Sequence, residues 1–167
     1  MSQLQFYHVD TAYIDYLDKF QKHIWENEEK GRKRPYVGLI MEISGFKYFA
    51  PMTSPKPKHF SMPEDLDLKK IFYKGELTGV INLNNLIPVK DEHIQMIDMV
   101  HLKNVDPKYS DLLNNQILIV RKRHDEFIKD ANLIYKIKTR NYKGYVGLKK
   151  RCYDFKKLES KCSEYNC

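Results

Sequence analysis

Residues 36–52 read YVGLIMEISGFKYFAPM, two runs rich in β-branched and aromatic residues that are separated by Ser44 and Gly45. Two such runs joined by two turn residues are typical of a tight β-hairpin. We therefore expect antiparallel strands over Tyr36–Ile43 and Phe46–Met52, and we take this hairpin as the first pair of a larger sheet.

Further strand signals flank the hairpin. Leu4–Val9 alternates as a strand does, and Lys70–Tyr73, Thr78–Leu83 and Leu86–Val89 would extend an antiparallel sheet. Glu26–Arg34 holds almost no apolar residue, so a mobile surface loop is expected there. Strands therefore dominate the first half of the chain.

Two helices are expected from apolar residues at helical spacing. The first follows Asp10 as N-cap and the second follows Asp106, with Pro107 as its first residue. The second is expected to be one long amphipathic helix. The apolar positions are Tyr13, Leu17, Phe20 and Ile24 in the first, and Tyr109, Leu113, Ile117, Val120, His124, Phe127 and Ala131 in the second. These elements predict an α+β fold with a barrel-like antiparallel sheet flanked by helices.

Composition narrows the class of protein. The 167 residues suit one domain over residues 1–167, and an apolar fraction of 42% excludes disorder for most of the chain. The 29 Lys and Arg against 22 Asp and Glu give a formal net charge of +7. An excess of this size favours a polyanionic partner, above all nucleic acid.

Several classes of protein are not indicated. The sequence shows no signal peptide and no apolar run long enough to span a bilayer, so a cytoplasmic protein without membrane contact is expected. The cysteines, Cys152, Cys162 and Cys167, are odd in number and form no CxxC pair, which predicts reduced thiols. No metal-binding or phosphate-loop motif occurs, so neither a metal nor a cofactor is expected.

The segment Thr53–His59 gathers the groups that RNA cleavage needs. Thr53 and Ser54 supply hydroxyls, Lys56 and Lys58 supply positive charge, and His59 can exchange protons near neutral pH. Cleavage by a ribose 2′-hydroxyl requires its deprotonation, neutralisation of the phosphorane and protonation of the leaving oxygen. Two prolines should keep the segment extended and stiff. The alternative is a Pro-rich surface turn whose lysines are merely solvated.

A second basic region lies near the C-terminus. Residues 136–157 hold nine Lys and Arg against the single acid Asp154, a balance of +8. Aromatic residues lie among these cations, as in surfaces that bind RNA, although a solvated basic face is the alternative. The candidate RNA-binding cations are Lys136, Lys138, Arg140, Lys143, Lys149, Lys150 and Arg151, and the aromatics are Tyr135, Tyr142, Tyr145, Tyr153 and Phe155.

Several motifs resemble the ToxN/AbiQ family of type III toxin–antitoxin endoribonucleases. The most specific is the Pro-x-Thr-Ser-Pro-Lys block of residues 51–56, directly after the hairpin. The resemblance continues to the helix that begins near Tyr109. It also covers Phe6-Tyr7 with Asp10, Tyr13–Leu17, Tyr36–Gly38, Glu42-Ile43, Gly45, Lys47-Tyr48, Gly79–Leu83, Asn85 and Ile87-Pro88.

The resemblance implies a strongly twisted antiparallel sheet similar to Kid/MazF toxins, and metal-independent cleavage of cellular or phage RNA that leaves 2′,3′-cyclic phosphate and 5′-hydroxyl ends. It further implies a small repeat RNA antitoxin, folded as a pseudoknot, that the toxin processes and that blocks the active site. Toxin and RNA in this family form closed assemblies, commonly three of each, and act against phage by growth arrest or abortive infection.

The resemblance also implies site residues. Ser54 and Thr53 match the active-site hydroxyls, Lys56 matches the catalytic lysine, and Tyr13 matches a tyrosine that lines the groove. The family's second active-site base aligns with Arg34 or, one residue earlier, Lys33, and only the lysine could lose a proton. His59 and Tyr109 match with less defined roles, and Arg32 belongs to the same basic stretch, which we expect to face a ligand.

Two other functions fit the residues. A non-catalytic RNA-binding module would use the same basic face to sequester RNA and would leave it intact. An inhibitor that binds the translation machinery by protein–protein contacts would keep binding at high salt, whereas binding dominated by phosphate contacts weakens steeply.

Overall fold

The structure is a computed structural model that describes residues 4–166. Its longer strands are β1 (Gln5–Val9), β4 (Tyr36–Ile43), β5 (Phe46–Thr53), β6 (Leu68–Tyr73) and β7 (Glu76–Asn82). Short strands are β2 (Glu28–Glu29), β3 (Arg32–Lys33), β8 (Ile87–Pro88) and β9 (Ile94–Met96). The helices are α1 (Thr11–Asp18), α2 (Pro57–Ser61), α3 (Met99–Val105), α4 (Pro107–Lys122), α5 (His124–Thr139), α6 (Val146–Arg151) and α7 (Phe155–Glu164), with 3₁₀ turns η1 (Leu83–Asn85) and η2 (Asp91–His93).

The main sheet is antiparallel and open. Its strands run in the order β6-β7-β5-β4-β1-β9, with β8 paired to β5. The expected hairpin is confirmed, because Ile43 pairs with Phe46 across a turn in which Ser44 and Gly45 both have positive φ. The barrel expectation is wrong: β6 and β9 end the hydrogen-bonded path without pairing to each other.

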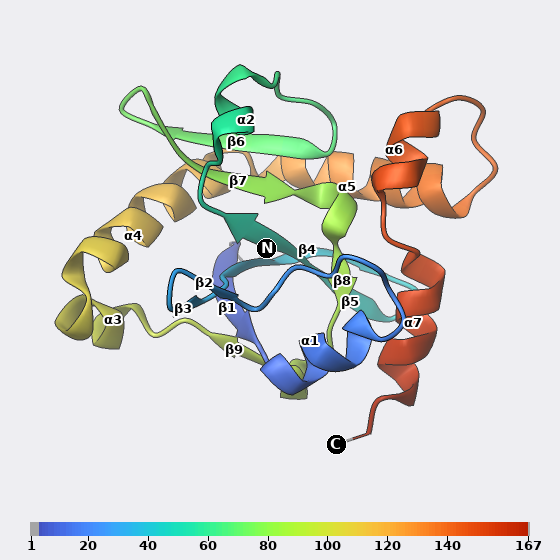
Figure 1. The fold of residues 1–167 in the computed structure, drawn as a ribbon, viewed down its shortest axis with the longest axis horizontal. Helices are drawn as coiled ribbons and strands as arrows, with labels where there is room; N and C mark the ends of the chain where they lie inside the picture. The colour runs from blue at the N-terminus through green and yellow to red at the C-terminus, as the bar shows by residue number, and fades with distance from the viewer. Residues whose placement is uncertain (1–3, 167) are drawn as a thin grey trace.

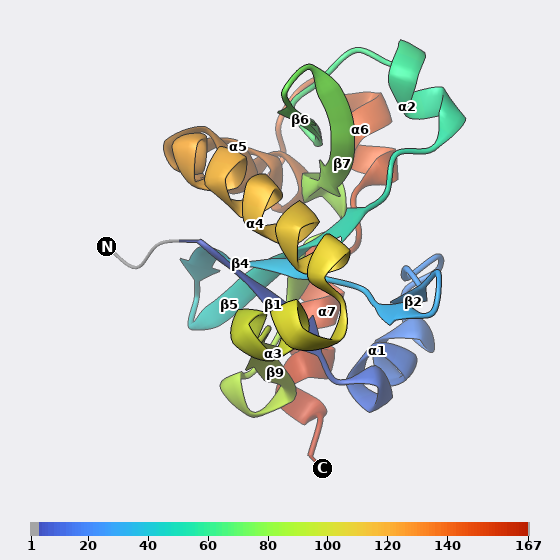
Figure 2. The same cartoon turned by 90° about the vertical axis from the view of Figure 1, so that its left-hand side faces the viewer.

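Helices cover both sides of this sheet. Helix α4 packs against β6 and β7, and α5 packs against β4. In Figure 2, β4 passes between α5 on one side and α1 and α7 on the other. Figure 1 shows α7 running alongside the segment that contains β8, and these two elements are in contact. The α+β expectation with flanking helices is therefore confirmed.

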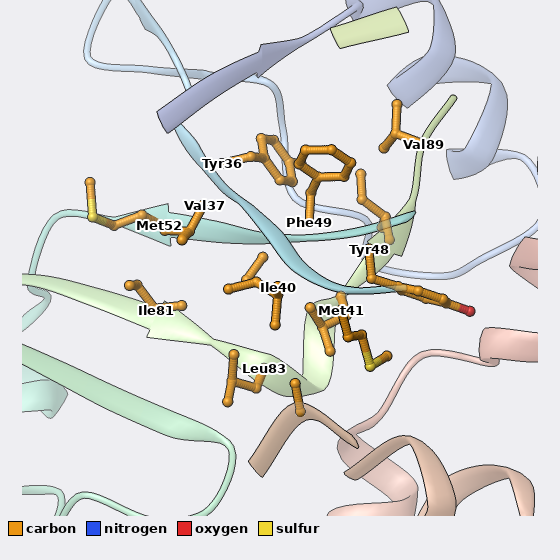
Figure 3. Packing of buried hydrophobic residues seen from close by; sticks show 14 of the residues in the cluster. Tyr36, Val37, Ile40, Met41, Tyr48, Phe49, Met52, Ile81, Leu83 and Val89 are labelled. Atoms are coloured by element: carbon orange, nitrogen blue, oxygen red, sulfur yellow. The ribbon is translucent and has the colours of Figure 1, made fainter. Parts of the chain in front are cut away.

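The core lies on the hairpin. Figure 3 shows side chains of β4 and β5 packing with Ile81 and Leu83 from β7 and η1. Tyr36, Ile40, Phe49 and Ile81 expose 1% or less of their surface. Burial of such side chains contributes about 1.5–3 kcal/mol each to folding, so the hairpin is the centre of the stabilising contacts.

Gly38 shows how closely the hairpin packs, and it leads to a stability prediction. A Cβ atom added at Gly38 would lie 2.0 Å from Cδ1 of Phe49, which is itself 1% exposed. We expect Gly38→Ala to lower the free energy of unfolding by about 2 kcal/mol, because the core cannot accept the extra methyl group without displacing this ring. Urea denaturation measures the loss. Gly147→Ala is the matched control, because Gly147 is exposed in α6 and a Cβ there would meet only the flexible end of Arg151, at 3.2 Å. A destabilisation by Gly38→Ala no larger than that of Gly147→Ala would contradict the packing argument.

Three helix and loop expectations are wrong. Helix α1 ends at Asp18, so Phe20 and Ile24 lie beyond it. Residues 26–34 are not wholly irregular, because β2 and β3 form a small hairpin across Lys30 and Gly31, both with positive φ. The segment after Ser54 is not extended throughout, because Pro57 begins α2 at a position where its missing N–H costs nothing.

The expected long helix is divided at Arg123. This residue leaves helical geometry (φ −102°, ψ 16°), and its guanidinium donates to the carbonyl of Lys70 in β6 and to Glu64 and Glu126. These contacts tie the junction of α4 and α5 to the sheet. The apolar residues keep their helical spacing across Arg123, because the apolar faces of both α4 and α5 pack against the sheet.

Candidate active site

The end of β5 brings several expected site residues into one pocket. Thr53 ends β5 and Ser54 follows it, and β3 and the β3–β4 link contribute Arg32, Lys33 and Arg34. Helix α4 forms a further wall. The pocket is lined by Lys30, Arg32, Lys33, Arg34, Pro35, Met52, Thr53, Ser54, Thr78, Tyr109, Leu112, Leu113 and Gln116. Segments far apart in sequence thus place hydroxyls and cations together, and we call this the Ser54 pocket.

The two hydroxyls differ in exposure. Thr53 is 5% exposed and pairs with Val80 of β7, whereas Ser54 follows the last paired residue and is half-buried. Because β5 is held on both sides up to this point, the position of Ser54 is set by the sheet rather than by a loose loop. This arrangement presents a hydroxyl to the pocket on rigid support.

Arg32 and Tyr109 form a linked pair at the pocket. The Arg32 guanidinium donates to Asp106 at 2.7 and 3.1 Å, and its Cζ atom lies 4.4 Å from the centre of the Tyr109 ring. Hydrogen bonds from Arg32 and from the Tyr109 N–H lower the pKa of Asp106. Asp106 is also the N-cap of α4, so one carboxylate joins the β3 strand to the start of this helix.

Arg34 is held by the protein itself. Its side chain is 7% exposed, donates to the carbonyls of Glu26 and Met52, and stacks on Trp25 at 4.8 Å. Lys33, in contrast, is exposed, and its ammonium group makes no hydrogen bond or ion pair within residues 4–166. Of the two candidates for the second basic position, Lys33 is therefore the one with a solvent-facing charge.

The remaining candidates of the Thr53–His59 segment do not line the Ser54 pocket. Lys56 is exposed at the N-cap of α2, and Lys58 and His59 line a second pocket. His59 is 4% exposed, and its Nδ1 accepts the Lys56 N–H at 2.9 Å, so it caps the short helix. Burial and the neighbouring Lys58 and Lys56 charges lower the pKa of His59, which favours the neutral form of the ring.

Tyr13 is not a groove residue, contrary to the resemblance. Its side chain is fully buried, its hydroxyl donates to the carbonyl of Pro88, and its ring stacks on His93 at 5.5 Å. Burial raises the pKa of the Tyr13 hydroxyl. Because Tyr13 lies on the inward face of α1, it supports the packing of that helix and has no exposed surface to offer a ligand.

The C-terminal basic segment is only partly a surface for ligands. Tyr135, Tyr153 and Phe155 are core residues, so just Tyr142 and Tyr145 remain as exposed aromatics. Several cations are bound internally: Lys138 donates to the carbonyl of Lys149, Lys149 to that of Tyr142, and Arg151 pairs with Asp67. Lys136 is half-buried, and Arg140, Lys143 and Lys150 are exposed.

Sequence patterns missed Gln116 of α4. It is 2% exposed, lines the Ser54 pocket and donates from Nε2 to the carbonyl of Thr78. A Cβ on Gly79 would lie 2.7 Å from that Nε2, so a larger residue at this position would displace the end of the Gln116 side chain. In the sequence, Gln116 can be noticed only as a polar residue within the apolar stripe that Leu113, Ile117 and Val120 form.

Other expectations concern thiols, metals and membranes. Cys152 and Cys162 are free thiols and both are buried, and Cys167 lies outside the described residues. Within residues 4–166, no three His, Cys, Asp or Glu side chains gather as metal ligands would. No helix in that range has the length and apolar character needed to cross a membrane.

Comparison with known proteins identifies the family. Residues 5–163 match the family model described as toxin ToxN of type III toxin–antitoxin systems. The chain belongs to this family. It is 34% identical to endoribonuclease ToxN of Bacillus thuringiensis subsp. kurstaki, with 96% of this chain and 84% of that protein covered. It is 29% identical to endoribonuclease AbiQ of Lactococcus lactis subsp. lactis, covering 98% and 90% of the two chains.

Solved structures agree with this membership. A structure from a study of selective toxin inhibition by a non-coding RNA pseudoknot in type III systems superposes with a TM-score of 0.88 at 33% identity, covering 98% of both chains. AbiQ, described as a lactococcal anti-phage endoribonuclease, gives a TM-score of 0.81 at 25% identity, covering 98% of both chains. As a member of the ToxN family, the chain is an endoribonuclease toxin.

Proposed function

We propose that this toxin cleaves RNA in the Ser54 pocket through attack of a ribose 2′-hydroxyl on the adjacent phosphorus. A 2′-oxygen–phosphorus bond forms as the bond to the 5′-oxygen breaks, so the products carry a 2′,3′-cyclic phosphate and a 5′-hydroxyl. The 2′-hydroxyl loses one proton and the leaving oxygen gains one. The observation that carries the proposal is the shared pocket of Ser54, Thr53 and Lys33 in a chain of the ToxN family.

Each residue has a role that suits its surroundings. Ser54 and Thr53 hydrogen-bond the scissile phosphate or the 2′-hydroxyl, and Lys33 neutralises the phosphorane and can donate the proton to the 5′-oxygen. Arg32 and Tyr109 hold the RNA by charge and stacking. Lys56 is exposed and follows Ser54 by two residues, so it adds positive charge along the path of the phosphates.

The partner of this toxin is proposed to be a small repeat RNA antitoxin folded as a pseudoknot. Inhibition by a non-coding RNA pseudoknot and processing of a non-coding RNA are described for two solved structures that resemble this chain. The antitoxin would cross the Ser54 pocket and follow the exposed cations Arg140, Lys143 and Lys150, in closed assemblies of three proteins and three RNAs. Cellular or phage RNAs would be the other substrates.

The chemistry of the product ends tests this proposal. Purified protein incubated with RNA and excess EDTA is expected to cleave it as fast as without EDTA, because the proposed groups are all side chains. The new 5′ ends should accept label from polynucleotide kinase directly, and the 3′ ends should be 2′,3′-cyclic phosphates by mass spectrometry. New 5′-phosphate ends would contradict 2′-hydroxyl attack, and RNA that binds but stays intact would favour the non-catalytic binding module.

A further inference from the structure

A second pocket adjoins the Ser54 pocket and is larger. It encloses about 380 Å³, which lies within the range of about 300–1,000 Å³ typical of small-molecule sites. Trp25 and His59 line it, together with Asn82, Asn84 and Asn85 around the end of β7 and η1. We call it the Trp25 pocket. None of the activities described above uses it.

Arg34 and the α2 segment connect the two pockets. Arg34 lines the Ser54 pocket while its guanidinium stacks on the Trp25 ring at 4.8 Å. Ser54 and Lys58, which line different pockets, are only four residues apart, so their Cα atoms lie within about 14 Å of each other. A chain bound at Ser54 can therefore reach the Trp25 pocket with a neighbouring unit.

The polar groups of the Trp25 pocket are arranged for a neutral planar ligand. Two of its charged groups neutralise each other, because both carboxylate oxygens of Asp67 accept from Arg151. The Asn84 side chain donates to the carbonyl of Arg151, but its Oδ1 is buried without a partner among residues 4–166. His59 accepts at Nδ1, so the neutral ring carries its proton on Nε2 and is a donor.

These groups match a nucleobase better than a phosphate or an apolar ligand. An indole ring provides a stacking surface, an unpaired amide oxygen accepts from a base N–H, and an imidazole N–H donates to a ring nitrogen or carbonyl. Lys58 and Arg151 on the lining balance Asp65 and Asp67, so the pocket has no net positive charge that would favour a phosphate. An apolar ligand is disfavoured too, because it would offer no hydrogen bonds to the polar side chains of Asn82, Asn84 and Asn85.

We propose that the Trp25 pocket binds a base of the RNA beside the cleavage point and thereby contributes to sequence selectivity. The proposal rests on the proposed function, since the same RNA strand occupies both pockets. Trp25 supplies the stacking surface and Asn84 Oδ1 the hydrogen-bond acceptor. A base held there aligns the strand so that the neighbouring phosphate lies at Ser54.

Trp25 is itself a probe, because the chain contains one tryptophan. In a Ser54→Ala background, which is expected to slow cleavage by about 10²–10³-fold, the tryptophan fluorescence should change on titration with pentaadenylate, pentacytidylate or pentauridylate, to different extents for the three. In that background, Asn84→Ala should weaken binding of the preferred oligonucleotide by roughly tenfold, the loss expected for one buried hydrogen bond. Asn114→Ala, an exposed asparagine of α4 that is absent from this pocket, is the matched control and should bind normally.

Cleavage assays with variants that retain Ser54 separate the base-pocket proposal from the proposed nuclease function. Asn84→Ala alone should cut a mixed RNA library with a relaxed base preference beside the cut, and Asn114→Ala should keep the original preference. An unchanged preference in Asn84→Ala, or oligonucleotide responses that do not differ from those of Asn114→Ala, would overturn the base pocket while leaving the nuclease intact. A base-dependent fluorescence change in a protein that never cleaves RNA would keep the pocket and remove the nuclease.

Discussion

Ser54→Ala is expected to lower the rate of RNA cleavage by about 10²–10³-fold, the range seen when one preorganised hydrogen-bond donor is removed from an active site. Ser54 is the half-buried hydroxyl that follows the last residue of β5 in the pocket with Lys33 and Thr53. The loss should appear in kcat for a defined RNA substrate, measured by single-turnover cleavage. Growth arrest on expression should disappear with it.

The fold should survive this substitution, because the lost hydroxyl is not part of the core. Ser61→Ala is the matched control: Ser61 lies in the same stretch of chain, at the end of α2, but is exposed and does not line the Ser54 pocket. It should cleave at the original rate. A folded Ser54→Ala protein that cuts RNA as fast as Ser61→Ala would remove Ser54 from the active site.

Glu159→Ala is expected to lower the free energy of unfolding by about 3–4 kcal/mol. Glu159 of α7 is 5% exposed, and its Oε1 accepts hydrogen bonds from the hydroxyls of Tyr48 at 2.6 Å and Tyr135 at 2.5 Å. Burial and these bonds to Glu159 raise the pKa of both hydroxyls, so both stay protonated and need an acceptor. Alanine would leave two buried donors unpaired, at a cost of about 1–3 kcal/mol each.

Two further substitutions make this result specific, with urea denaturation as the measurement. Glu159→Gln keeps an oxygen that can accept from both tyrosines and should lose much less stability than Glu159→Ala. Glu164→Ala removes an exposed carboxylate of the same helix and should change the free energy of unfolding by less than about 0.5 kcal/mol. Equal losses in Glu159→Ala and Glu159→Gln would show that the phenol hydrogen bonds are not the cause.

The candidate site illustrates which residues a sequence pattern can find. Thr53, Ser54, Lys33 and Tyr109 were all proposed from local motifs, and the structure places them in one pocket. Tyr13 was proposed in the same way, yet it is buried, because motif matching does not tell which face of a short helix points inward. Gln116 was missed, because its neighbours in the pocket come from β3, β5 and β7, and those contacts exist only after folding.

The basic segment at residues 136–157 was interpreted from its positive charge and the aromatic residues interleaved with it, and this pattern overestimates the exposed surface. Tyr135 of α5 and Phe155 of α7 lie among lysines in sequence, yet both are core residues of their helices, and Tyr153, in the link between α6 and α7, is buried as well. Helical periodicity places residues three or four apart on one face, so interleaving in sequence becomes separation in space. The exposed remainder, with Tyr142 and Tyr145, is a smaller surface than the sequence predicted.

The sequence by itself determined the elements whose cause is local: the β4–β5 hairpin with its two-residue turn, and the α4 helix with Asp106 and Pro107 at its start. It also determined the family, through the block of residues 51–56 beside that hairpin. Only the tertiary structure decided that the sheet stays open, that the long helix divides at Arg123, and that Arg34 is held against Trp25 while Lys33 faces solvent. Each of these outcomes depends on contacts between residues far apart in sequence, which compete with local preference and which no local pattern encodes.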